Sequence, residues 1–160
     1  VAQLALSAKP GANGLTLLPY FEGERTPNRP TATGVFAGMN LNNSNPEDIA
    51  RAMVEGMLAG LADAVDALVA LGVGVNRILL IGGAAKNPAV PAIASALFGR
   101  EVLVPPAGEY VADGAAKQAA WALLGRLPTW DLGEVSHHKS EATPEVMMRY
   151  RELKNNTQNW

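Results

Sequence analysis

The clearest pattern along the chain is a helical repeat of apolar residues that starts after Asn45. Asn45 is a favourable helix N-cap, and Pro46 suits the first helical position. Apolar residues then recur at spacings of three and four until the chain reaches Gly72: Ile49, Met53, Met57, Leu61, Ala64, Val65 and Leu68. Polar residues fall on the other side: Arg51, Glu55 and Asp66. The pattern therefore predicts a helix over residues 46–71 with one apolar and one polar face.

Two glycines lie inside this predicted helix. Gly56 and Gly60 each weaken a helix by about 1 kcal/mol relative to alanine. Their presence predicts that another backbone packs closely against this part of the helix.

Short apolar runs and turn residues divide the rest of the chain into further elements. The predicted extended segments are 15–21, 34–41, 77–81 and 101–104. The predicted helices are 88–98, which ends at Gly99, and 111–124, which ends at Gly125. Because strand and helix alternate in the middle of the chain, the pattern predicts an α/β fold with parallel strands and crossover helices.

The end of the chain is expected to form a loop over 126–144 and a helix over 144–155, capped by Thr143. We expect residues 1–130 to form the main domain and residues 131–160 to pack on it as a loop and helix. The sequence contains neither an internal repeat nor a low-complexity segment.

The composition is that of an ordinary globular protein. With 160 residues, 48% of them hydrophobic and 18% charged, one domain is the expectation. The net charge of -2 and the lack of a basic run argue against nucleic acid as a partner. No apolar run approaches the ~20 residues that a membrane span needs, so no membrane contact is expected. The absence of cysteine fits a reducing compartment, and the cytoplasm is therefore the expected location.

The stretch RILLIGGAAKNP, residues 77–88, is the first candidate for a site. An apolar run leads into Gly82 and Gly83, and Asn87 then precedes a proline at a helix start. The turn matches neither the dinucleotide fingerprint nor the P-loop. Two interpretations stay open: a ligand lies against the bare backbone and its free amides, or the segment is a tight turn with a helix cap. Asn87 accordingly either caps the helix or offers its amide to a heterocycle.

Other residues are expected to have structural roles. In the segment GERTP we expect Glu24 and Arg25 to form a local ion pair that shapes a loop. Surface positions are expected for Asp113 and for the pair His137 and His138, which has no third metal ligand nearby in sequence. Three aromatic residues are expected in the core: Tyr20, Phe21 and Trp121.

Several blocks of the sequence resemble the FGGY family of carbohydrate kinases. GVFAGM at 34–39, followed by eight residues and then DIARAMVE at 48–55, resembles the family's second sequence signature closely. Further blocks resemble the xylulose kinase branch of the family, in order and at plausible spacings: LPYFEGERTP at 18–27, IGGAAKNP at 81–88 and GEYVADGAAKQAAWAL at 108–123. Together the blocks cover most of residues 15–125.

The resemblance implies a fold and an activity. Kinases of this family have two domains of the actin and sugar-kinase type, each built on a ribonuclease-H-like fold, with sugar and ATP meeting in the cleft between them. This chain looks like the C-terminal, ATP-binding side, incomplete at its N-terminus. The implied reaction transfers the γ-phosphate of ATP to a pentulose, D-xylulose, giving D-xylulose 5-phosphate. The alternative is a non-catalytic module of the same fold that binds a nucleotide or a partner. The oligomeric state stays open, with a homodimer as one alternative.

The resemblance also assigns the glycine turn. It implies an adenosine motif made of Gly82, Gly83, Ala84 and Asn87. In this motif Gly83 lets the adenine and ribose, not the phosphates, lie on the backbone, and Asn87 reaches the purine. Glu109 and Tyr110 are candidates for the same nucleotide side. No catalytic or metal-binding residue is carried over, because the catalytic aspartate and the phosphate loops belong to segments before Val1. Kinase chemistry implies Mg²⁺ with the ATP, held by ligands outside this chain. The isolated chain is therefore predicted to be inactive.

Overall fold

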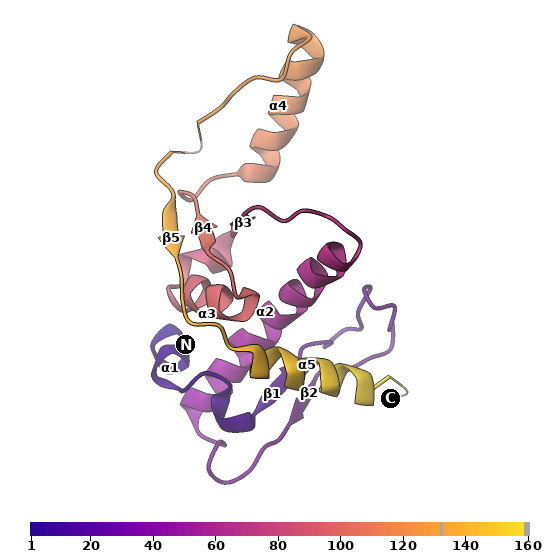
Figure 1. The fold of residues 1–160 in the computed structure, drawn as a ribbon, viewed down its shortest axis with the longest axis vertical. Coiled ribbons are helices and arrows are strands. Elements are labelled where there is room, and N and C mark those ends of the chain that lie inside the picture. The colour runs from indigo at the N-terminus through magenta and orange to yellow at the C-terminus, as the bar shows by residue number, and fades with distance from the viewer. Residues whose placement is uncertain (132, 159–160) are drawn as a thin grey trace.

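The computed structural model describes residues 1–131 and 133–158, and its elements follow the predicted order closely. The helices are α1 (Ala2–Ser7), α2 (Pro46–Ala70), α3 (Ala89–Phe98), α4 (Tyr110–Leu124) and α5 (Pro144–Asn156), with short 3₁₀ turns η1 (Ala12–Gly14) and η2 (Gly83–Lys86). The strands are β1 (Thr16–Leu18), β2 (Val35–Ala37), β3 (Ile78–Leu79), β4 (Val102–Val104) and β5 (Ser136–His138). Figure 1 shows α2 crossing the centre of the molecule, with α5 alongside β1 and β2.

The strands form two small sheets. β1 and β2 are antiparallel, with Leu17 opposite Phe36. β3 and β4 are parallel, with Ile78 opposite Val102, which confirms the predicted α/β crossover through α3. The second sheet has the order β3-β4-β5, so β4 lies in its middle.

The strand β5 corrects one prediction, because its residues were expected to form a loop. β5 runs antiparallel to β4 and places His138 opposite Val102. The hydroxyl of Ser136 also donates a hydrogen bond to the Val104 carbonyl oxygen, at 3.1 Å. The sequence of β5 is polar and lacks apolar alternation, and the strand forms because β4 offers backbone groups that need partners.

The start of α2 and its glycines are as predicted. The Asp48 amide donates to the Asn45 side-chain oxygen at 2.9 Å, as in an N-cap. A Cβ added at Gly56 would lie 2.5 Å from the Leu17 carbonyl oxygen, and one at Gly60 would lie 3.3 Å from the hydroxyl of Tyr150. Both glycines therefore allow a neighbouring segment to pack closely.

The side of α2 that faces the body, however, differs from what its apolar repeat suggests. Arg51 and Glu55 are buried, with only 6% and 3% of their surface exposed, whereas Met53, Met57 and Leu61 are 48%, 43% and 51% exposed. An amphipathic helix normally turns its apolar stripe to the core, so the sidedness inferred from the repeat is wrong for this chain. The inward side carries small residues that let α1 and β1 approach: Ala52, Gly56, Ala59 and Ala62.

The buried ion pair of α2 is fully partnered. Arg51 Nε lies 2.6 Å from Glu55 Oε1, which also accepts the Gly11 amide at 2.9 Å. Arg51 Nη1 donates to the Ala5 carbonyl oxygen at 3.4 Å. These contacts tie the N-terminal segment to α2, and they explain how two charged residues occupy the inward side.

The helix α5 packs against α2 and β1 through Val146, Met147, Tyr150 and Leu153. Burial raises the pKa of the Tyr150 hydroxyl well above its usual value. Thr143 stands at the N-cap position as predicted, but its buried hydroxyl makes no hydrogen bond within the described residues, so the cap is positional only.

Aromatic residues and α4 show where the core ends. Tyr20 is buried as predicted, but Phe21 and Trp121 are more than half exposed, so the prediction that they lie in the core is wrong. Trp121 belongs to α4, which extends away from the rest of the chain (Figure 1) and contains no buried residue. Among the described residues, no helix is both long enough and apolar enough to cross a membrane.

Candidate functional site

A cleft lies where the parallel strands β3 and β4 end. Its volume is about 520 Å³, and two segments line it: Leu80–Lys86 without Ala84, and Val104–Tyr110. Each segment follows the carboxyl end of its strand. Because parallel strands point the same way, their carboxyl ends meet at one edge of the sheet, which is the usual place for a ligand in open α/β folds.

The first wall is the glycine turn. The Leu80 amide still donates to the Leu103 carbonyl oxygen at 2.9 Å, so the sheet holds the turn at its entry. Gly82 has φ 98° and ψ 177°, a backbone conformation that is essentially restricted to glycine. Gly83 has no positive φ, and a Cβ added there would meet nothing within 4 Å. The fold of this chain therefore requires glycine at position 82 but leaves open space at position 83.

The other two residues of the expected motif lie on the same turn but do not line the cleft. Ala84 is exposed, and Asn87 is half-buried. The Asn87 side-chain oxygen accepts the Ala89 amide at 3.0 Å, at the start of α3. The N-cap of α3 is Pro88, which makes no side-chain capping hydrogen bond, so the Asn87 side chain forms a local turn just before the helix and satisfies one of its free amides.

The second wall is the segment between β4 and α4. The Tyr110 hydroxyl donates a hydrogen bond to the Pro106 carbonyl oxygen and so fixes the bend of this segment. Glu109 and Tyr110 line the cleft opposite the glycine turn, which places them on the side expected from the sequence. The pattern analysis missed Lys86 and the residues Pro105–Gly108. The adjacency of the two parallel strands was the signal that could have found them.

The chemistry of the lining suits an uncharged, flat group. Lys86 and Glu109 are the charged residues among those that line the cleft, one of each sign. The rest of the lining is apolar or backbone, a mixture typical of small-molecule sites. Of the lining residues Lys86 alone carries a positive charge, so the cleft offers little positive charge to a triphosphate. The described residues hold no group of three His, Cys, Asp or Glu side chains that could bind a metal ion.

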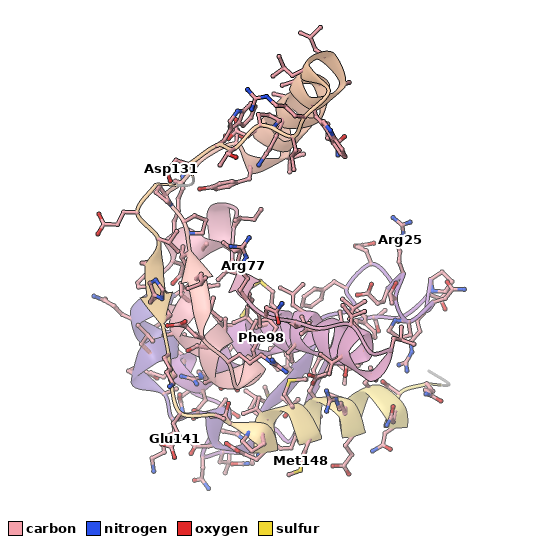
Figure 2. All side chains as sticks on the ribbon, turned by 45° about the horizontal axis from the view of Figure 1, so that its top comes forward. Arg25, Arg77, Phe98, Asp131, Glu141 and Met148 are labelled. Carbon is pink, nitrogen blue, oxygen red and sulfur yellow. The ribbon has the colours of Figure 1, made fainter. Side chains whose placement is uncertain are left out.

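The remaining candidates lie away from this cleft. Asp113 is exposed as expected. Glu24 shapes its loop by accepting the Arg25 amide at 2.7 Å and the Thr26 amide at 3.3 Å, but it forms no ion pair with the Arg25 guanidinium in the described structure. Figure 2 shows the Arg25 side chain at the tip of this loop, pointing outward. The predicted ion pair is therefore wrong, and Glu24 holds the loop through the backbone amides of Arg25 and Thr26.

The same histidine pair expected at the surface lies on β5. His137 is exposed, and its Nδ1 lies 3.1 Å from Glu101 Oε1. His138 is only partly exposed, and its Nε2 lies 3.2 Å from the Ser136 hydroxyl. Both histidines therefore have local polar partners on the outer strand of the sheet.

A crevice at the carboxyl ends of parallel strands, bordered by a glycine turn, is typical of α/β domains that bind small molecules. Its elements match the ribonuclease-H-like, actin-type fold of sugar kinases. A sequence model of the FGGY family of carbohydrate kinases, C-terminal domain, matches residues 1–123, and the chain belongs to this family.

Curated and solved relatives agree with this assignment. The chain is 37% identical over 120 residues to the xylulose kinase of Haemophilus influenzae, an alignment that covers 75% of this chain and 24% of that protein. It is 38% identical over 123 residues to the xylulose kinase of Streptomyces rubiginosus, covering 76% of this chain and 25% of that protein. The crystal structure of xylulose kinase from Bifidobacterium adolescentis matches 96% of this chain and 31% of its own, with 47% identity and a TM-score of 0.83. The chain thus spans about a quarter of the curated relatives it matches.

Proposed function

We propose that this chain is the ATP-binding side of a kinase that phosphorylates D-xylulose to D-xylulose 5-phosphate. The observation that carries the proposal is the similarity to xylulose kinases, at 37% identity in Haemophilus influenzae and 47% in the solved Bifidobacterium adolescentis protein. The cleft at the ends of β3 and β4 adds a nucleotide-sized space on the matched side. In this proposal the kinase acts in the cytoplasm, and a homodimer is one alternative for its oligomeric state.

In this proposal the cleft binds adenosine. The base and ribose lie against the backbone of the turn Gly82–Ala84, opposite the wall that ends at Tyr110. The side chain of Asn87 reaches the purine. The phosphates leave the cleft toward groups outside this chain, where Mg²⁺ supplies charge stabilisation. A base outside this chain takes the proton of the sugar hydroxyl, whose oxygen bonds to the γ-phosphorus while the bond from that phosphorus to the bridging oxygen breaks and ADP leaves. The residues of this chain therefore bind and orient the nucleotide.

The first test is a chimera. The 160 residues replace the matched 31% of the Bifidobacterium adolescentis kinase, and a coupled assay measures ADP release with D-xylulose and with other sugars. We expect turnover with D-xylulose in the chimera and none with the isolated chain. A folded chimera that turns over a different sugar in preference would refute the substrate, and an active isolated chain would refute the role of the chain.

A second test addresses the nucleotide site. Gly83→Val should raise the KM for ATP by about tenfold or more and leave the KM for the sugar nearly unchanged, because it removes binding shared by the ground and transition states. Gly74→Val is the matched control: Gly74 also lacks a positive φ and has nothing within 4 Å of an added Cβ, but it does not line the cleft. If the folded Gly83→Val enzyme had an unchanged KM for ATP, the glycine turn would have only a structural role.

The competing function is a non-catalytic module of the same fold. It predicts that the chimera binds ATP, measured by calorimetry, without transferring phosphate to any sugar. Gly83→Val would then weaken binding while turnover stays absent.

A further inference from the structure

One dipeptide in the chain is chemically reactive. Asn13 is followed by Gly14, and no other asparagine in the sequence precedes a glycine. The backbone nitrogen of a following residue can attack an asparagine side chain, and glycine leaves that nitrogen unshielded because it has no Cβ. The pair belongs to η1, and Asn13 is exposed there. Asn13 is therefore the asparagine of this chain that is best placed to lose its side-chain amide.

The backbone of η1 leaves space around this dipeptide. Asn13 has φ 48° and ψ 35°, in the left-handed region that asparagine adopts more readily than most residues. Gly14 has φ 93°, and a Cβ added there would meet nothing within 4 Å. No neighbouring side chain therefore blocks the approach of the Gly14 nitrogen to the Asn13 side chain.

Hydrogen bonds of the folded chain engage both reacting groups. The side-chain nitrogen of Asn13 donates to the two carboxylate oxygens of Asp48, at 2.9 and 3.1 Å. The backbone nitrogen of Gly14 donates to the Gly11 carbonyl oxygen at 2.8 Å. The attack requires both groups to be released, and it therefore requires a local opening of η1. The fold protects the dipeptide through these contacts, although it does not bury it.

The nitrogen that would leave is the one that binds Asp48. Asp48 is only 2% exposed, and its Oδ2 also accepts the Asn45 side-chain amide at 2.7 Å, at the start of α2. Deamidation replaces the donating nitrogen of Asn13 with a negatively charged oxygen. A hydrogen bond then becomes a repulsion between two carboxylates, in a place where salt and water screen charges weakly.

We propose that Asn13 is a spontaneous deamidation site, that opening of η1 limits its reaction, and that its product weakens the start of α2. The Gly14 nitrogen bonds to Asn13 Cγ and loses its proton, the bond from Cγ to Nδ2 breaks, and ammonia leaves, which gives a cyclic imide. Water then adds to one of the two imide carbonyl carbons, and the ring opens. Opening at one carbon gives aspartate, and opening at the other gives isoaspartate, in which the backbone runs through the side-chain carbon.

The isoaspartate product disturbs a second contact. Its backbone is one carbon longer, which displaces the carbonyl oxygen of residue 13. In the unmodified chain this oxygen accepts the side-chain amide of the buried Asn43, at 3.2 Å. The reaction needs water alone as a co-reactant, and the inference does not depend on the proposed function.

Peptide mapping by mass spectrometry tests the site in the 160-residue chain. The chain is incubated in warm, mildly alkaline buffer, with and without denaturing guanidinium chloride. In denaturant Asn13 should form both aspartate and isoaspartate, and in native buffer it should react slower by about tenfold or more, because η1 must open first. Exposed Asn28 and Asn42, which no glycine follows, are internal controls, and their slow rates should be similar in both conditions.

A substitution tests the effect of the product. Asn13→Asp should lower the melting temperature by several degrees, because the new carboxylate faces Asp48. Asn42→Asp is the matched control: it makes the same change of charge at an exposed residue that forms hydrogen bonds only through its backbone within the described structure. Its melting temperature should stay near that of the wild type. If Asn13→Asp does not fold, aged wild-type chain separated by ion exchange supplies the product for the same measurement.

Other outcomes would overturn the proposal. An Asn13 that stays intact in denaturant would show that the dipeptide is not reactive. Equal rates in denaturant and in native buffer would show that η1 gives no protection. Aspartate without isoaspartate would show that water, and not the Gly14 nitrogen, attacks the side chain. Equal melting temperatures for Asn13→Asp and Asn42→Asp would show that the product leaves the start of α2 unaffected.

Discussion

The start of α2 and the glycine turn after β3 lie in the same chain but are held in place in different ways. At the start of α2, buried polar groups are partnered by residues of the chain itself. At the turn and in α4, the backbone is exposed and side chains meet few neighbours: a Cβ at Gly83 would meet nothing within 4 Å, and α4 buries no residue. The conformation at the start of α2 is therefore fixed by contacts within the chain. The glycine turn and α4 are left accessible to groups outside the chain.

The first region also explains a block of the sequence that resembles the family signature. Asn43 is fully buried; its amide donates to the carbonyl oxygens of Gly38 at 2.9 Å and Asn13 at 3.2 Å, and its oxygen accepts the Asn40 amide at 2.7 Å. Asp48 accepts the Asn13 side-chain amide at 2.9 Å. In this chain the block over 34–55 thus holds the loop between β2 and α2 in one conformation, and it contacts the cleft nowhere.

The largest expected effect lies in the first region. Glu55→Ala leaves the buried Arg51 guanidinium without its carboxylate and the Gly11 amide without its acceptor. Removing one partner of a buried pair costs about 3 to 5 kcal/mol, which urea denaturation of the isolated chain would measure. Glu152→Ala, on the exposed side of α5, should stay near the wild-type midpoint. Equal midpoints for the two variants would contradict the burial of the pair.

Substitutions of glycines in two helices test the contrast between α2, which is packed on both β1 and α5, and α4, which buries no residue. Gly56→Leu should cost about 1 to 3 kcal/mol by overpacking, because its Cβ would lie 2.5 Å from the Leu17 carbonyl oxygen. Gly60→Leu should cost less, since the hydroxyl of Tyr150 can move. Gly114→Leu in α4 meets nothing within 4 Å and should be neutral or stabilising through helix propensity. A destabilising Gly114→Leu would show that α4 is packed in solution.

A smaller effect depends on pH. Burial alone would raise the pKa of Asp63, but hydrogen bonds from Lys154 and Arg151, together with their positive charges, outweigh it and hold the pKa below its usual value. A carboxyl group whose pKa is lower in the folded state than in the unfolded state stabilises the folded protein fully when the pH is above the unfolded-state pKa. This stabilisation is lost as the pH falls through the folded-state pKa. Asp63→Asn should cost roughly 1 kcal/mol at pH 7, and the difference from wild type should disappear once the pH falls below the lowered folded-state pKa of Asp63. A difference that persists in acid would contradict this ion pair.

The smallest effect is expected in α4. Leu124→Ser should change the stability of the isolated chain by less than about 0.5 kcal/mol, because Leu124 is exposed and its helix buries nothing. Thermal melting followed by circular dichroism would measure it. A loss as large as that of a buried leucine such as Leu58 would mean that α4 folds back on the body.

Local signals predicted the elements well, and tertiary contacts decided the rest. The cap at Asn45, the glycine ends of α3 and α4 and the strand before Gly82 were readable because each depends on neighbours in sequence. Which side of α2 is buried was not readable, because the Arg51–Glu55 pair is stabilised by residues far away in the chain. β5 escaped detection for a similar reason, since its pairing with β4 is set by the open edge of the sheet.

Only one of the two walls of the candidate site could be predicted from the sequence. Gly82 and Gly83 stand out in the sequence, and the resemblance to the kinase family gave them a ligand to test. The opposite wall, Pro105–Gly108, carries no motif, and only the parallel pairing of β3 with β4 brings it to the turn. Ala84 and Asn87 were grouped with the glycines by position, while the fold turns them away from the lining.

The position of Ala84, exposed and next to the cleft without lining it, makes this turn convenient for optical measurements. The sequence has no cysteine, so Ala84→Cys would introduce a unique thiol. An environment-sensitive fluorophore attached there would sit at the mouth of the cleft and leave the lining intact. Its emission could then be followed in a stopped-flow instrument. The change in emission would report the association and dissociation rates of a ligand.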